Sequence, residues 1–256
     1  MKATLTVLGS GTSMGVPTIG CDCAVCHSTD PHDRRTRPSV MLTYNGKTVL
    51  IDTTPDFREQ AIREQIRSVD AVLYTHTHAD HILGLDDLRP LSYHRGGKIP
   101  LYARPEAADF IRNMFRYIFD ANYKYGGLAQ VELHPINGSV ELFGAQFEPV
   151  QVMHGDAPII GFRFGSAAYL TDFSEIPEAS FAQLKDLDIV FLDALRHKPH
   201  PTHSTVENSL RIVERLKPRR AFFTHICHDL PHQATNATLP PHVRLSYDGM
   251  KLEFEI

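Results

Sequence analysis

The sequence predicts an α/β fold in which strands and helices alternate along the whole chain. Short apolar runs with a period of two residues interchange with segments whose apolar residues recur at helical spacing. The chain has 256 residues, of which 42% are hydrophobic and 22% are charged, so it can bury a sizeable core. No linker, repeat or shift of composition divides it, and we expect one domain over residues 1–256.

The first elements are predicted from their periodicity and their turns. An alternating strand at 4–8 leads into the glycine-rich loop at 9–15. Strands at 39–44 and 47–51 flank Asn45-Gly46, a pair typical of the type I′ turn of a β-hairpin. Apolar residues at helical spacing predict a helix over 54–67, in which Pro55 suits the first helical position. The apolar run 71–74 indicates a short buried strand.

The remaining elements continue the alternation. Helices are predicted at 87–93, 106–119, 177–185 and 205–216. Strands are predicted at 140–143, 146–153, 159–164, 167–170, 189–192, 221–224, 243–246 and 251–255. The segment 117–127 (YIFDANYKYGG) is interpreted either as a lid over a site or as a surface helix end with a turn.

Charge and composition exclude several classes of protein. The chain has 26 Lys and Arg against 30 Asp and Glu, and a net charge of −4 argues against a broad nucleic-acid surface. No apolar run approaches the roughly 20 residues of a membrane span, and the N-terminal residues lack a signal peptide's apolar block. We therefore expect a cytoplasmic protein without a membrane partner. Four cysteines and fifteen histidines, many of them clustered, point to metal binding.

The strongest motif follows the predicted strand at 71–74. The segment THTHADH places His76, His78, Asp80 and His81 within six residues. Imidazole and carboxylate groups suit zinc, manganese and iron. His76 and His78 project to the same side if the backbone stays extended, and a turn after residue 79 brings Asp80 and His81 to a neighbouring point. Two such pairs can serve two metals.

In its full extent, THTHADHILGL, this motif resembles the signature of the metallo-β-lactamase superfamily. The resemblance implies a four-layer αββα sandwich of two mixed sheets with a metal centre at one edge. Later residues support it, because His154, Asp172 and His225 each stand at or just beyond the end of a predicted strand. Asp52, after the strand at 47–51, is expected to orient a ligand or the loop. The resemblance implies a first metal on His76, His78 and His154, a second on Asp80, His81 and His225, and a bridge by Asp172.

A second cluster lies in the loop at about 15–30, where Cys21, Cys23 and Cys26 form a tight turn. Structural zinc takes four ligands, and Cys227 and His228 are the candidates for the fourth. The pattern GVPxxxCxCxxC resembles the phosphoribosyl cyclic phosphodiesterase (PhnP-like) branch of the superfamily, and PqqB-like proteins share a similar segment. In that branch the fourth ligand is a histidine three residues after the last catalytic histidine, which implies His228 here.

Hydrolysis also needs a proton donor for the leaving oxygen, and histidine suits that role near neutral pH. His197, His200 and His203 lie in the segment RHKPHPTHST. His203 stands just before the predicted helix at 205–216, and its surroundings resemble a segment of tRNase Z. In the PhnP-like branch the matching histidine is the proposed general acid. Asp193, after the strand at 189–192, is expected to orient His203.

These features predict a metal-dependent phosphodiesterase for a small cyclic or nucleotide-like substrate, such as 5-phosphoribosyl 1,2-cyclic phosphate, attacked by a metal-bridging hydroxide. Its cofactors are two divalent metals (Zn or Mn) and one structural zinc, and its catalytic residues are His203, Asp80 and Asp193. The alternatives are tRNA 3′ processing, lactone or thioester hydrolysis, and a PqqB-like role. Nucleic acid is not an expected partner, because the long basic, glycine-rich arm of tRNase Z is absent. The resemblance suggests a homodimer, and the stretch RRTR at 34–37 is either a second phosphate site or a solvated turn.

Overall fold

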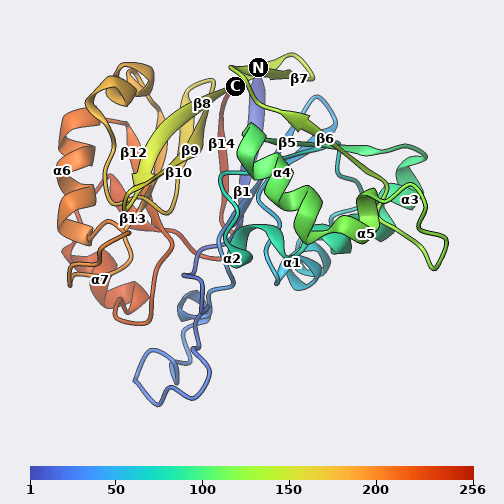
Figure 1. The fold of residues 1–256 in the computed structure, drawn as a ribbon. Helices are drawn as coiled ribbons and strands as arrows, with labels where there is room; N and C mark the ends of the chain where they lie inside the picture. Colours follow the sequence, from blue (N-terminus) through green and yellow to red (C-terminus); the bar gives the residue numbers. More distant parts are fainter.

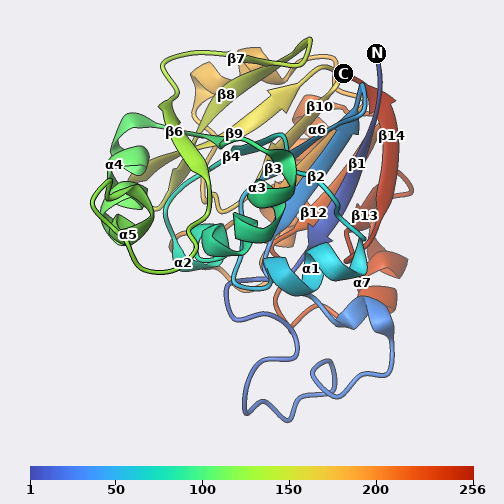
Figure 2. The same cartoon turned by 90° about the vertical axis from the view of Figure 1, so that its right-hand side faces the viewer.

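The computed structural model describes residues 1–256 as two β-sheets face to face, with helices on the outer side of each (Figures 1 and 2). Each sheet has seven strands. The first sheet has the order β14 (Lys251–Glu255), β1 (Lys2–Gly9), β2 (Ser39–Tyr44), β3 (Lys47–Ile51), β4 (Ala71–Leu73), β5 (Ile99–Ala103) and β6 (Val131–Pro135). The second has the order β13 (Val243–Leu245), β12 (Arg220–Thr224), β11 (Ile189–Asp193), β10 (Ala167–Leu170), β9 (Ala157–Phe164), β8 (Ala145–His154) and β7 (Val140–Leu142). The predicted four-layer sandwich is thereby confirmed.

The helices form the two outer layers (Figure 1). The first sheet is covered by α1 (Phe57–Arg63), α3 (Arg89–Arg95), α4 (Pro105–Met114) and α5 (Arg116–Phe119). The second is covered by α6 (Val206–Leu216) and α7 (His232–Thr238). The short helix α2 (Ala79–Ile82) lies at the lower end of the gap between the sheets in Figure 1.

The core is divided among the three interfaces between the four layers. In β2, Val40 and Leu42 belong to the cluster of 24 buried residues between the sheets, whereas Met41 belongs to the cluster under the first helix layer. In β11, Phe191 faces the other sheet and Leu192 faces the second helix layer. Successive side chains of a strand point to opposite faces, and here both faces are covered. This is why the central strands are apolar without a polar alternate residue.

Strand direction determines where the functional side chains gather. The β2–β3 hairpin turns at Asn45 and Gly46, whose φ angles of 49° and 68° fit the predicted turn. From β3 to β6 the first sheet is parallel, and from β10 to β13 the second sheet is parallel as well. The carboxyl ends of parallel strands lie at one edge, so the loops that follow them meet there.

The helix boundaries differ from the periodicity at several points. The helix expected at 54–67 spans only Phe57–Arg63. The residues just before it bind the loop that carries the histidine motif, because the Thr53 backbone N–H donates to the His81 carbonyl at 2.8 Å. The predicted helix 106–119 breaks at Phe115, where ψ is 37°, and gives α4 and α5. The segment expected at 177–185 forms a 3₁₀ helix, Glu178–Leu184. The segment expected at 87–93 begins as 3₁₀ turns before α3.

Four elements were not predicted because their sequences carry weak signals. Strand β5 contains Pro100, and β6 ends in Pro135 with a half-exposed polar pattern. Helix α7 has the polar sequence HQATNAT, and α2 is a single turn inside the histidine motif. All four depend on tertiary packing more than on local periodicity.

The segment 117–127 packs against α3. Arg89 donates from Nη1 to the Gly127 carbonyl at 3.1 Å, and Tyr117 and Tyr123 form an edge-to-face pair. No residue of this segment lines the cavity beside the metal-type cluster described below. Its role as a lid stays a prediction. No helix of the structure combines the length and apolar character that a bilayer span requires.

The basic stretch 34–37 is partly buried and partly exposed: Arg34 is exposed, and the second phosphate site stays a prediction. Arg35 is fully buried, and its guanidinium donates to the carbonyls of Cys227 at 2.8 Å and Leu230 at 2.7 Å. Its Nη2 also pairs with Asp33 at 3.0 Å, and Arg37 pairs with Asp56 at 2.8 Å. The segment between β1 and β2 (residues 10–38), here called the N-terminal arm, extends away from the sheets in Figure 2. Arg35 therefore fastens this arm to the loop after β12.

Candidate metal centre

One edge of the sandwich gathers the predicted His and Asp side chains from loops far apart in sequence. The loop after β4 and helix α2 supply the histidine motif, β8 ends at His154, and the loops after β10 and β12 supply Asp172 and His225. Donor atoms of Asp80, His81, Asp172 and His225 lie within 4.8 Å of one another. Those of His76, His78 and Asp172 form a second such group, and those of His154, Asp172 and His203 a third.

Asp172 is the shared member of these three groups. Its Oδ2 lies 3.1 Å from His225 Nε2 and 3.9 Å from His76 Nε2, and its Oδ1 lies 3.3 Å from His81 Nε2. Asp80 Oδ2 lies 3.3 Å from His81 Nε2. The two ligand sets implied by the resemblance are thus adjacent, and Asp172 stands between them.

The donor set fits divalent cations. The cluster is buried except for His78, yet several of its polar atoms have no hydrogen bond of acceptable geometry. These atoms are His76 Nε2, Asp80 Oδ2, His81 Nε2, His154 Nδ1, and Nδ1 and Nε2 of His225. Buried polar atoms without partners are costly, and a bound cation satisfies them.

The electrostatics of the cluster agree with cation binding. Burial opposes charge on Asp172, but the neighbouring His225 and His81 hold the pKa of that carboxyl well below its usual range. Burial and the neighbouring His81 lower the pKa of His76 far below its usual value, which leaves its ring free to coordinate. Burial also disfavours a charged His225, but Asp172 raises its pKa to about 10. The buried carboxylate of Asp172 is therefore stabilised by positive charge at this edge.

Asp52 holds the histidine motif in place from the end of β3. Its Oδ1 accepts from the Thr75 backbone N–H at 2.9 Å, and its Oδ2 accepts from the Thr75 hydroxyl at 2.8 Å. The same Oδ2 lies 2.7 Å from His81 Nδ1. A proton on Nδ1 leaves Nε2 of His81 as the coordinating atom, the arrangement typical of metal-binding histidines. The expected supporting role of Asp52 agrees with these contacts.

Several residues at the same edge have an unusual backbone conformation. Asp52, Asp172 and His225 have φ angles of 66°, 58° and 58°, a region that non-glycine residues rarely occupy. Each follows directly, or within two residues, the end of a buried strand. Gly84 lets the motif approach α1 closely, because a Cβ there would lie 2.0 Å from the Thr54 carbonyl oxygen. Such strained positions cluster at functional sites, where the surrounding structure over-determines them.

His203 and Asp193 form a hydrogen-bonded pair beside the cluster. His203 Nδ1 lies 2.7 Å from Asp193 Oδ2, and its ring stacks on His225 with centroids 4.5 Å apart. Asp193 is fully buried, which raises the pKa of its carboxyl against the opposing effect of His203. Thr205 caps α6 by accepting from the Asn208 backbone N–H, and so fixes the loop that carries His203. His197 points elsewhere and pairs with Glu207.

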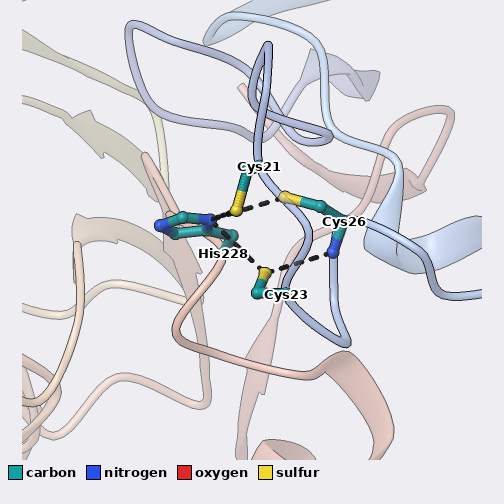
Figure 3. Close-up of side chains that lie close together, drawn as sticks. All are labelled: Cys21, Cys23, Cys26 and His228. Atoms are coloured by element: carbon teal, nitrogen blue, oxygen red, sulfur yellow. Dashed lines mark hydrogen bonds between the residues drawn. The ribbon is translucent and has the colours of Figure 1, made fainter.

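The cysteine cluster lies on the N-terminal arm (Figure 3). The Nδ1 atom of His228 lies 3.2, 3.5 and 3.4 Å from the sulfurs of Cys21, Cys23 and Cys26. Ligands of a tetrahedral zinc, with Zn–S of about 2.3 Å and Zn–N of about 2.0 Å, would stand roughly 3.5 Å apart. The structure brings His228 to the sulfurs, and Cys227 lies outside this group.

Thiolate chemistry at this cluster favours metal binding. The Cys26 backbone N–H donates to Cys23 Sγ at 3.4 Å and lowers the pKa of that thiol to about 7. Burial raises the pKa of Cys26 to about 11, so a cation is needed to hold its thiolate. His228 follows His225 by three residues, and Arg35 binds the loop between them and beyond. The cysteine cluster therefore supports the loop that carries His225.

We expect Cys21→Ser to lose one zinc per chain and to lower Tm by at least about 5 °C, because structural zinc contributes directly to folding. Elemental analysis and thermal unfolding measure both effects. Cys227→Ser is the control: it leaves the three sulfurs and His228 in place and should keep the full zinc count. An unchanged metal content and Tm in Cys21→Ser would contradict a zinc site here.

Two kinds of residue near the site were not predicted from the sequence. Thr75 and Arg35 support the site through hydrogen bonds, and no local pattern distinguishes them from other polar residues. Arg104 and Phe110 border the His76 side of the cluster, but they follow β5, a strand that was not predicted. Recognising β5 as parallel to β4 would have placed Arg104 at the same edge.

Comparison with known proteins identifies the family and the fold. Residues 47–226 match the family model described as the beta-lactamase superfamily domain. A solved structure described as a new diphosphatase from the PhnP family is 63% identical, covers 99% of this chain and 98% of its own, and has a TM-score of 0.94. Zinc-bound PqqB from Methylobacterium extorquens has 20% identity, coverage of 97% and 99%, and a TM-score of 0.81, a likeness of fold alone. An octanoyltransferase of Porphyromonas gingivalis is 41% identical over 250 residues, 96% of this chain and 50% of that protein.

The fold and the buried His/Asp cluster define a metal-dependent hydrolase. The family model covers most of the chain, and the chain belongs to the metallo-β-lactamase superfamily, in its PhnP-like branch. The chain spans about half the length of the octanoyltransferase that it matches. The predicted family and enzyme class are therefore confirmed, at the level of a divalent-metal hydrolase.

Proposed function

We propose that the chain hydrolyses a P–O bond in a small phosphodiester, with His203 as proton donor to the leaving oxygen. The His203–Asp193 pair carries this proposal. It stands directly beside the cluster, through the stacking of His203 on His225, and it has the geometry of an oriented acid. A protein that only stored metal would not need such a pair.

Each of the two residues has a distinct task. Asp193 accepts from the Nδ1–H of His203, which fixes the ring and leaves Nε2 as the nitrogen that can donate a proton. In the reaction, the oxygen of water forms a bond to phosphorus while the bond to the leaving oxygen breaks. The proton on His203 Nε2 passes to that leaving oxygen, and a proton of the attacking water restores the balance. A simple diester gives a phosphate monoester and an alcohol, which remain in one molecule when the diester is cyclic. A diphosphate diester gives two phosphate monoesters, because the leaving oxygen belongs to the second phosphate.

The proposed ligands divide between two cations. When bound, divalent metals supply an acidified water and positive charge against the phosphate oxygens. Asp80 both holds a cation and orients the attacking water, and Asp172 stands between the two positions. The proposed ligands of the two cations, Zn or Mn, are His76, His78, His154, Asp80, His81, His225 and Asp172. Cys21, Cys23, Cys26 and His228 are proposed to hold one structural zinc.

The substrate is proposed as a small diester, cyclic or nucleotide-like, or a diphosphate diester. The last form is favoured by the 63% identical relative, which is described as a diphosphatase. Octanoyl transfer is not proposed, because that name belongs to a protein of which the chain matches half the length. We also propose a homodimer, which the resemblance to the PhnP-like branch supports and which analytical ultracentrifugation measures.

The test combines metal content with a substrate panel. Protein purified without chelator should contain about three metals per chain by elemental analysis, two for the His/Asp cluster and one for the cysteines. It should hydrolyse bis-p-nitrophenyl phosphate and a ribosyl cyclic phosphate faster than an activated lactone or an octanoyl thioester. A metal count near one, or faster cleavage of the lactone or the thioester, would contradict the proposal.

A further inference from the structure

A small cavity opens directly beside the His/Asp cluster. Its volume is about 230 Å³, and its walls include His76, His78 and His154. Arg104, which precedes α4, and Glu106 and Phe110, which lie within α4, also line it. Typical ligand pockets hold about 300–1,000 Å³, so this cavity accommodates one end of a substrate and leaves the remainder outside.

Arg104 is the one Lys or Arg among the residues that line this cavity. Its Nη1 donates to the Pro158 carbonyl at 3.1 Å, and its Nη2 lies 2.5 Å from Glu106 Oε1. Its side chain keeps 31% of its surface exposed, so the guanidinium retains free N–H groups. A guanidinium offers five donors in a planar fork that matches phosphate oxygens. Arg104 follows β5, which is parallel to β4, and so stands at the same edge as the histidine motif.

Phe110 gives the same cavity an apolar wall. Phe110 is 44% exposed although it is a large aromatic residue, and Ala107, Pro158 and Ile159 also line the cavity. Arg104 directly precedes α4, and Phe110 lies within that helix. An exposed aromatic face beside a cation is suited to a planar ring joined to an anionic group.

We infer that this cavity binds the part of the substrate beyond the scissile phosphate, with a second phosphate on Arg104 and a planar ring against Phe110. The inference rests on the proposed function, because it requires the scissile phosphate at the His/Asp cluster. It identifies the substrate class as a diphosphate diester that carries a planar heterocycle. Arg104 and Phe110 are then specificity residues that determine KM and take no part in proton transfer.

The test compares ADP-ribose, which has two phosphates and a purine, with bis-p-nitrophenyl phosphate, which has one phosphate. Arg104→Ala should raise KM for ADP-ribose about 10–100-fold, the effect of one lost charge-assisted hydrogen bond, with little change in kcat. Phe110→Ala should raise the same KM about 5–50-fold through lost stacking, and Phe110→Tyr should restore it. Bis-p-nitrophenyl phosphate lacks a second phosphate but has planar rings, so its kinetics should stay within about twofold for Arg104→Ala.

The controls use matched residues away from the cavity. Arg112→Ala removes an exposed arginine of the same helix, and Tyr125→Ala removes an aromatic side chain that is 79% exposed. Both should behave as the unaltered protein. An unchanged KM for ADP-ribose in Arg104→Ala, or equal damage on both substrates, would overturn the inference. Hydrolysis of bis-p-nitrophenyl phosphate without hydrolysis of ADP-ribose overturns the inference alone, whereas failure with both overturns the proposed function.

Discussion

Replacing His203 with alanine should lower turnover of a ribosyl cyclic phosphate by roughly 10²–10⁴-fold, the usual contribution of a general acid. The loss should be much smaller for bis-p-nitrophenyl phosphate, because p-nitrophenolate leaves without needing a proton. Metal content should remain unchanged, since His203 is not a proposed ligand. Steady-state kinetics on both substrates and elemental analysis of the same preparation measure these effects.

Neighbouring histidines make this experiment specific. His197 lies in the same loop, is exposed and pairs with Glu207, so His197→Ala should retain full activity. His203 also shares a potential metal-binding group with His154 and Asp172. If His203→Ala damages both substrates equally and loses metal, His203 is a ligand, and the proton must come from another group. His200, whose ring centroid lies 5.0 Å from that of His203, is then the next candidate.

Asp172→Ala should abolish hydrolysis of both substrates and reduce the metal count of the His/Asp cluster. Removing an outer partner of a metal ligand already costs about 10–100-fold, so losing the carboxylate shared by three groups should cost more than about 100-fold. The leaving group should make no difference, in contrast to His203→Ala. Elemental analysis should still find the zinc proposed for the cysteine cluster, because Asp172 is not among its proposed ligands.

Asp172→Asn distinguishes the effect of losing the charge from the effect of disturbing the backbone. Asp172 has a φ angle of 58°, a conformation that asparagine tolerates better than alanine. The asparagine variant should therefore fold as well as the unaltered protein, as measured by circular dichroism, and still lose activity. Retention of two cluster metals and of turnover in both variants would show that Asp172 is not the shared ligand.

The cysteine cluster and the His/Asp cluster are connected through one loop. His225 and His228 both follow β12, and the buried Arg35 binds the carbonyls of Cys227 and Leu230 in that loop. A cation held by the cysteines and His228 would therefore restrain the segment that supplies His225. This connection explains why a structural site on an extended arm can matter for the stability of the catalytic edge.

The sequence by itself determined the elements whose signal is local. The Asn45-Gly46 hairpin, the strands at both sheet centres and the capped helix α6 follow from periodicity and turn chemistry, and the structure has them at nearly the expected bounds. The order of His and Asp residues after strands also indicated a metal-type cluster. The elements and the ligand-type residues could be predicted because burial patterns and ligand chemistry depend on individual residues and their immediate neighbours.

Tertiary structure alone decided which distant residues meet. The contact of His225 with Asp172 at 3.1 Å depends on the pairing of β10, β11 and β12, and the choice of His228 over Cys227 depends on how the arm folds back. The burial of Arg35 and its bonds to the carbonyls of Cys227 and Leu230 could not be predicted from the basic composition of residues 34–37. Strands β5 and β6 form because they pair with neighbouring strands. Their proline and polar residues break the apolar alternation that predicts a strand from the sequence. Such outcomes depend on the relative positions of segments that lie far apart in the chain, and no local periodicity encodes these positions.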